Sequence, residues 1–372
     1  MAEIEQSPLM GHTSRRGFMA IGGAAAAAGA LMFGDWTPAR AADAVLPKRT
    51  LGRTGLQVTC LAYGGIQLTD ASSRAALEHA IDRGVNYVHT CPGYTGGKSI
   101  QVVGEVMRTR RDKVYLALKT DPHDVDRCLK ILNTDHVDVL IPDTWGINRS
   151  GRDPEGADEK AKYDALKQAG KIRFAGFATH NDQVDRLTAA YKGGWRDVVL
   201  IAKYLSNQQA FEPLYEAAAK SGMGIMAMKV ASGPQATFAE KIRVHLKNPN
   251  IACVTPGMNS IDQIDQNIAT VCATIAELRH GGGQVAAATG AVHGECTLCG
   301  DCVKVCAPGV ALLDYLRADL YRDRGDVRLA QDLVRAIPAR NSLAACTHCG
   351  HCNHTCQHGV DVVGVMEHLA RA

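Results

Sequence analysis

The chain has 372 residues, which is enough for one large domain and one small domain. Its formal net charge is +3, with no block of like charges, so the composition predicts neither a nucleic-acid-binding protein nor binding to an acidic membrane surface. The sequence contains 13 cysteines, and those outside two short runs are scattered along the chain: Cys60, Cys91, Cys128, Cys253 and Cys272. An odd, dispersed set is not typical of a disulfide framework. We expect most of these five to be small, buried, apolar residues.

Residues 1–41 are typical of an export signal. The stretch SRRGFMA at 14–20 precedes an apolar run rich in Ala and Gly, and Ala39-Arg40-Ala41 is a small-x-small cleavage site. The run is too short and too rich in glycine to span a membrane stably, so we expect no transmembrane span in the mature chain. The paired arginines resemble a twin-arginine signal, which exports folded proteins to the periplasm. An ordinary secretory signal and an uncleaved anchor are the alternatives.

Residues 48–280 alternate short apolar runs, rich in β-branched residues, with amphipathic stretches that several times end before a glycine. Eight such units predict an α/β fold, a (β/α)8 TIM barrel, and a doubly wound open sheet is the alternative. The expected strands are residues 58–65, 85–90, 114–120, 136–143, 172–180, 197–204, 224–231 and 251–257.

Titratable side chains lie at or just after the C-terminal ends of six of these strands. Chemistry in a TIM barrel takes place at this rim, and so many titratable groups there are difficult to explain by packing. The sequence therefore predicts a site at the rim, with the candidates His89, Tyr94, Lys119, Asp143, His180, Lys203, Tyr204 and Lys229.

The remaining residues divide into a Gly- and Ala-rich linker at 281–294 and a small domain at 295–372. Two helical patterns between residues 310 and 339 predict that this domain is mostly helical. It contains the spacing C-x2-C-x2-C-x3-C twice, at 296–306 and 346–356.

This spacing is that of bacterial ferredoxins, in which three thiolates of a run bind one 4Fe-4S cluster and the fourth binds the other. Zinc is the alternative, because C-x2-C pairs also bind zinc, but a zinc site takes four ligands from two pairs and not two runs of four. The expected ligand sets are Cys296, Cys299, Cys302 and Cys356 for one cluster, and Cys346, Cys349, Cys352 and Cys306 for the other.

Motifs along residues 48–270 resemble those of the aldo/keto reductase family, in order and in spacing. They are LGRTGLQVTCLAYGG, AIDRGVNYVHTCPGYTGGKSIQVVGEVM, VYLALKT, GKIRFAGFATHN and TPGMNSIDQIDQNI. The stretch MGIMAMKVASG and the attached cysteine domain resemble the subgroup of the family that has a twin-arginine signal and a C-terminal ferredoxin-type 4Fe-4S domain.

The resemblance implies an Asp, Tyr, Lys and His tetrad, in which Tyr gives a proton to a carbonyl oxygen while a nicotinamide gives hydride. Tyr94 and Lys119 match the two inner members, and a neighbouring cation is what makes a phenol a usable acid near neutral pH. His89 stands at the Asp position and Asp143 at the His position, so the outer members are exchanged. A site that has lost its activity is the alternative to an altered but working one.

The positions that hold the nicotinamide cofactor in this family also differ. The Ser-Asn pair after the fifth strand corresponds to Ala178-Thr179, and the Gln on the sixth strand corresponds to Leu200. Residues 254–270, where a basic side chain binds the 2′-phosphate in the family, contain no Lys or Arg. We therefore expect NADP(H) to bind weakly or not at all.

These features predict a periplasmic iron-sulfur oxidoreductase in which two 4Fe-4S clusters replace nicotinamide as the electron route. Tyr94 would exchange a proton with a small-molecule substrate, Lys119 would tune Tyr94, and His89 and Asp143 would position them. A redox protein is the expected partner. The alternatives are a non-catalytic electron-transfer subunit with the barrel as a docking scaffold, and an NADPH-dependent carbonyl reductase.

Overall fold

The computed structural model describes residues 45–142, 153–179, 183–202, 208–230, 235–279, 296, 300–322 and 327–371. Several predictions fall elsewhere in the chain: the signal at 1–41, the linker at 281–294, and the candidates Asp143, His180, Lys203, Tyr204 and Cys299 lie outside the described residues. Among the helices of the described stretches, none is long and apolar enough to cross a membrane.

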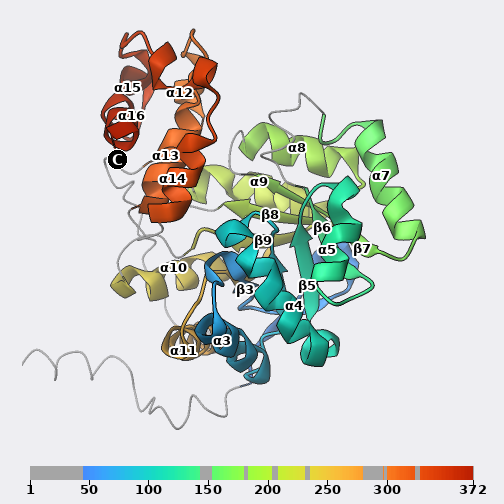
Figure 1. The fold of residues 1–372 in the computed structure, drawn as a ribbon. Coiled ribbons are helices and arrows are strands. Elements are labelled where there is room, and N and C mark those ends of the chain that lie inside the picture. The colour runs from blue at the N-terminus through green and yellow to red at the C-terminus, as the bar shows by residue number, and fades with distance from the viewer. Residues whose placement is uncertain are drawn as a thin grey trace, which may run out of the picture. The chain divides into compact units, whose positions relative to one another are not determined.

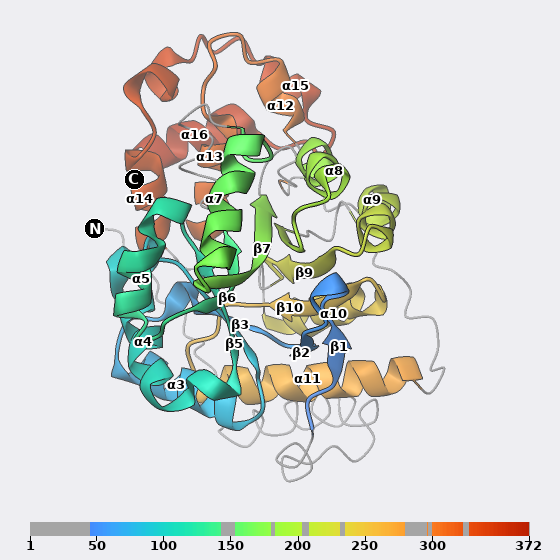
Figure 2. The ribbon, with the colours of Figure 1, turned by 90° about the vertical axis from the view of Figure 1, so that its right-hand side faces the viewer.

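Eight parallel strands follow one another around a barrel in chain order (Figure 2). Between the first strand and the last, parallel bridges join Leu61 to Val254 and Gly64 to Gly257, so the sheet is nearly closed. This confirms the predicted barrel and excludes the doubly wound open sheet. The strands are β3 (Tyr63–Gly64), β4 (Tyr87–Thr90), β5 (Tyr115–Lys119), β6 (Val137–Ile141), β7 (Ile172–Thr179), β8 (Val198–Ala202), β9 (Gly224–Met228) and β10 (Ile251–Thr255).

A helix follows each strand, and an antiparallel hairpin of β1 (Lys48–Thr50) and β2 (Gln57–Thr59) precedes the barrel. In α3, Asp70 and Ser73 form a capping box. In α4, Gly104 allows close contact with α5, because a Cβ at this position would lie 2.0 Å from the carbonyl oxygen of Ile131. The helices are α3 (Ala71–Asp82), α4 (Lys98–Arg110), α5 (Val125–Ile131), α7 (Ala157–Gln168), α8 (Gln183–Gly193), α9 (Gln208–Lys220), α10 (Gln235–Lys247) and α11 (Ile261–Arg279).

The strands are apolar along their whole length because helices cover one face and the barrel interior takes the other. Every residue of β6, β8, β9 and β10 is buried. Tyr87, Leu200 and Met226 belong to the core of the barrel interior. Val88, Ile201 and Ala227, one position further along the same strands, belong to the core beneath the helices.

The described part of the cysteine-bearing segment is helical, as its sequence predicts. Its helices are α12 (Asp301–Lys304), α13 (Leu312–Arg322), α14 (Val327–Arg335), α15 (His351–Thr355) and α16 (Val362–Arg371) (Figure 1). Helix α12 contacts α15, and α13 contacts both α14 and α16. By its contacts, this segment belongs to the same compact unit as the barrel, residues 45–372.

The described parts of the two cysteine runs fold alike, at a constant offset of fifty residues along the chain. A left-handed glycine precedes each short helix, Gly300 with φ 92° before α12 and Gly350 with φ 73° before α15. A second left-handed glycine follows each run, Gly309 with φ 68° and Gly359 with φ 67°. Helices α13 and α16 begin three residues after these glycines. The segment is therefore a structural duplication built around the repeated motif.

Candidate functional site

Two neighbouring strands bring His89 and Lys119 to the C-terminal rim of the barrel. His89 is the third residue of β4 and Lys119 is the last residue of β5, and both side chains are buried. Tyr94 begins the turn η3 (Tyr94–Gly97) after β4. Its ring meets the His89 imidazole edge to face, with 5.8 Å between the ring centroids. Three of the four predicted catalytic residues are thus on one side of the rim, and the fourth, Asp143, lies outside the described residues.

The turn that carries Tyr94 has an unusual backbone. Thr95, Gly96 and Gly97 have φ angles of 50°, 64° and 88°, and a left-handed conformation is uncommon for a threonine. The Thr95 hydroxyl donates to the Leu68 carbonyl at 2.8 Å and accepts from the Ser99 amide at 3.1 Å. Side-chain hydrogen bonds therefore hold this conformation and fix the backbone beside Tyr94. Backbone strain of this kind is found at functional sites.

The His89 imidazole is neutral at physiological pH. Burial, and after it the charges of Lys119 and Lys229, lower its pKa from 6.5 to about 3. Its Nε2 atom is buried and has no hydrogen-bond partner among the described residues. A neutral imidazole cannot supply the negative charge of the aspartate that it replaces. It can exchange a hydrogen bond with a bound ligand.

Lys229, the residue after β9, is also a rim residue. Its φ angle of 63° places a lysine in the left-handed region, where side chains other than glycine are uncommon. Its ammonium group donates a hydrogen bond to the Tyr321 hydroxyl and lies 3.9 Å from the centroid of the Tyr321 ring. Tyr321 comes from α13 in the cysteine-bearing segment. The sequence placed Lys229 at the rim, but no local pattern could have indicated Tyr321.

Of the three strand positions that correspond to nicotinamide contacts in the family, Thr179 alone has a polar side chain, and it is buried. Ala178 on β7 and Leu200 on β8 are buried and apolar. Pro256 and Gly257 follow β10, and the Gly64 amide donates to the Pro256 carbonyl at 2.9 Å. Neither Ala178 nor Leu200 can donate or accept a side-chain hydrogen bond to a carboxamide.

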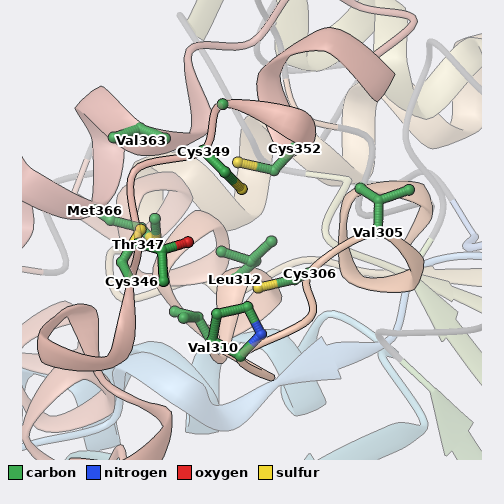
Figure 3. Close-up of a pocket in the computed structure, with 12 residues that line it drawn as sticks. Val305, Cys306, Val310, Leu312, Cys346, Thr347, Cys349, Cys352, Val363 and Met366 are labelled. Carbon is green, nitrogen blue, oxygen red and sulfur yellow. The ribbon is translucent and has the colours of Figure 1, made fainter.

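A second candidate site lies in the cysteine-bearing segment. A cavity there is lined by three cysteines of the second run together with Cys306, the last cysteine of the first run. Figure 3 shows the Cys349 and Cys352 sulfurs directed toward a common space, which Cys306 borders from the other side. The rest of the lining is mostly apolar and includes Val310, Leu312, Val363 and Met366. This is the group of four cysteines that the spacing predicts for one cluster.

The sulfur atoms of this region accept hydrogen bonds from the backbone. The His348 amide donates to Cys346 Sγ, and the Val360 amide donates to Cys356 Sγ, each at 3.4 Å. Burial raises the pKa of the Cys352 thiol. A hydrogen bond from the His351 backbone, and after it one from the Thr347 side chain, lower the pKa of the Cys349 thiol. The thiolate is the form of cysteine that binds a metal centre.

The spacing of these side chains bears on which metal centre could fit. No three His, Cys, Asp or Glu side chains among the described residues are close enough together to hold one metal ion. A zinc ion draws four sulfurs around a single centre at about 2.3 Å. The thiolates of a 4Fe-4S cluster each bind a different iron and stand further apart. The four cysteines that line the cavity offer the thiolate donors that both kinds of centre take.

The barrel region has known relatives. Residues 61–243 match the aldo/keto reductase family, so this part of the chain is an aldo/keto reductase family domain. This confirms the family that the motifs suggested. Residues 1–41 and the cysteine-bearing segment lie outside this match.

Two curated proteins show the extent of the similarity. An uncharacterized oxidoreductase, YqkF, of Bacillus subtilis is 27% identical over 154 residues, which cover 36% of this chain and 48% of YqkF. L-galactose dehydrogenase of Arabidopsis thaliana is 24% identical over 280 residues, covering 60% of this chain and 87% of that enzyme. The first alignment therefore spans about half of the relative's length.

Solved structures of aldo-keto reductases share the fold. One from Pseudomonas aeruginosa has a TM-score of 0.53 at 22% identity and covers 61% of this chain and 96% of its own. Another, from Klebsiella pneumoniae in complex with NADPH, has a TM-score of 0.51 at 19% identity, with coverages of 65% and 97%. At these identities the likeness establishes the barrel fold alone.

Proposed function

We propose that the protein is a periplasmic oxidoreductase of the aldo/keto reductase type, in which two 4Fe-4S clusters take the place of the nicotinamide cofactor. The reaction class is the interconversion of a carbonyl and an alcohol. Reduction of the carbonyl consumes two electrons and two protons, and the two clusters together would supply the electrons when bound. Export through the twin-arginine route fits a protein that must acquire its clusters before it leaves the cytoplasm.

The observation that carries this proposal is the cavity lined by Cys346, Cys349, Cys352 and Cys306. Four cysteines that line one mostly apolar cavity offer the donor set of a 4Fe-4S cluster. In the proposed assignment Cys296, Cys299, Cys302 and Cys356 hold the second cluster. The fifty-residue structural repeat supports this, because the Gly300 and Gly350 turns place the two runs in equivalent conformations.

At the rim, we assign proton transfer to Tyr94. Its hydroxyl would donate to the carbonyl oxygen during reduction and accept the proton during oxidation. The buried ammonium of Lys119 would stabilise the phenolate that forms, and Asp143 would be the carboxylate partner of Lys119. His89, neutral and in edge-to-face contact with Tyr94, would orient the phenol and offer Nε2 to the substrate.

An NADPH-dependent carbonyl reductase is the second candidate, and the family match at residues 61–243 is the observation that favours it. The apolar side chains of Ala178 and Leu200 argue against it, since they offer no hydrogen bond to a nicotinamide carboxamide. A non-catalytic electron-transfer subunit is a third reading, in which the rim groups would have no substrate.

Steady-state assays of the isolated, cluster-loaded chain separate these functions. We expect carbonyl reduction with an artificial low-potential electron donor and none with NADPH. Tyr94→Phe should abolish turnover and leave both clusters intact, whereas Tyr115→Phe, a change at the half-buried start of β5, should not. Turnover with NADPH alone would establish the carbonyl reductase instead. Full activity in Tyr94→Phe would remove the function from this rim.

A further inference from the structure

Two elements of the cysteine-bearing segment reach the rim of the barrel beside the proposed catalytic residues. Tyr321 of α13 accepts a hydrogen bond from the ammonium group of Lys229, at the end of β9. Arg328 of α14 approaches the turn after Tyr94, since its Nη2 lies 3.9 Å from the position of a Cβ built on Gly96. The two contacts are at the ends of β9 and β4, which are separated around the barrel by β10 and β3. The α13–α14 pair therefore forms part of the wall of the barrel site.

The groups at this wall are mostly cationic. The charges of Lys119 and Lys229 both act on the buried His89 imidazole, and Arg328 lies against the turn that carries Tyr94. Asp143, the carboxylate expected at this rim, lies outside the described residues. The chemistry complementary to ammonium, guanidinium and phenol donors around a buried imidazole is an anionic oxygen.

Tyr321 controls where the Lys229 charge is located. Lysine has four rotatable side-chain bonds and many rotamers, so an ammonium group at a rim is mobile unless a partner fixes it. Tyr321 fixes it twice, through the hydroxyl and through the face of the ring. The left-handed backbone of Lys229 directs the side chain at a cost in conformational energy. Packing of the cysteine-bearing segment against the barrel would require neither a left-handed backbone at Lys229 nor an ammonium group held in one position.

We propose that Lys229 and Tyr321, together with His89, form a subsite for an anionic oxygen of the substrate, a carboxylate or a phosphate. Tyr321 is the positioning residue of this subsite, and the cysteine-bearing segment supplies it. The assignment of the bound anion as substrate rests on the proposed function. The existence of the anion subsite does not rest on the proposed function, because anion binding can be measured without turnover.

The test uses the full, cluster-loaded chain with ¹⁵N-labelled histidine, and His89→Gln assigns the His89 imidazole resonances. Acetate and inorganic phosphate are titrated separately at constant ionic strength, with chloride as the reference salt. Tyr315→Phe is the matched control for Tyr321→Phe, because Tyr315 is on the same helix and its hydroxyl accepts from the Leu343 amide, within the segment.

We expect at least one of the two anions to shift the His89 Nε2 resonance. A stronger effect of acetate would indicate a substrate with a carboxylate, and a stronger effect of phosphate would indicate a phosphorylated substrate. The dissociation constant should rise by at least about tenfold in Lys229→Met, the loss of one charge-assisted hydrogen bond, and several-fold in Tyr321→Phe, with no change in Tyr315→Phe. Equal affinities in all four proteins, or no shift with either anion in the wild type, would overturn the subsite. Anion binding without any turnover would retain the subsite and reject the proposed function.

Discussion

The buried, neutral state of His89 predicts how the stability of the barrel depends on pH. The pKa of His89 falls from 6.5 in the unfolded chain to about 3 in the folded one, chiefly through burial. Between these values the unfolded state binds a proton that the folded state does not bind. The free energy of unfolding therefore decreases as the pH falls below 6.5, and the loss is complete only below pH 3.

The size of the effect follows from the shift. The difference between 6.5 and about 3 corresponds to about 5 kcal/mol in total. At pH 5, where the folded imidazole is still neutral and the unfolded one is largely protonated, the loss relative to pH 8 is about 2 kcal/mol.

Urea unfolding of the full chain at pH 8 and pH 5, followed by the fluorescence of Trp195, measures this loss. Trp195 packs against Tyr163 in the barrel, so its emission reports on the barrel fold. In His89→Gln the titrating group is absent, and the pH dependence should be smaller by about 2 kcal/mol. His136→Gln, which removes a half-exposed histidine before β6, is the control and should behave as the wild type. The reasoning is refuted if His89→Gln and the wild type lose the same stability, or if the folded imidazole titrates near 6.5 by NMR.

Three further predictions concern the clusters, the cofactor and export. The reconstituted mature chain should contain about eight irons. Cys306→Ser should damage the cluster held by the second run, and a spectrum that lacks only the first-run cluster would disprove the crossed assignment. NADPH should bind no more tightly than the millimolar range, since Ala178 and Leu200 provide no carboxamide contacts, and a micromolar dissociation constant by calorimetry would reinstate the carbonyl reductase. Replacing Arg15-Arg16 by Lys-Lys should stop export, whereas unchanged secretion would indicate the general secretory route.

The barrel could be predicted from sequence because its strands are buried on both faces. Runs such as β8 and β9, with every residue buried, appear in the sequence as short apolar segments bounded by polar or turn residues. The rim candidates His89 and Lys119 followed from the same pattern, because a residue at the end of a parallel strand must lie on that edge. Spacing also placed Cys306 with the second run, and both line one cavity.

The sequence could not indicate what depends on long-range packing. Tyr321 reaches Lys229 across 92 residues, and on α13 it has the appearance of an ordinary apolar-face residue. The neutral state of His89 depends on burial and on two lysines from other strands. The left-handed turn at Thr95 depends on hydrogen bonds to Leu68 and Ser99. Each of these requires the assembled barrel.

The central claim is that electrons reach the barrel site from the clusters, and a single-turnover experiment tests it most directly. The isolated chain is reduced anaerobically, freed of reductant and mixed with a panel of carbonyl compounds, while the visible absorbance of the clusters is followed. The account predicts that at least one carbonyl reoxidises the clusters with formation of the alcohol, and that Tyr94→Phe prevents it. Clusters that stay reduced with every carbonyl, while the same chain oxidises NADPH, would contradict the account.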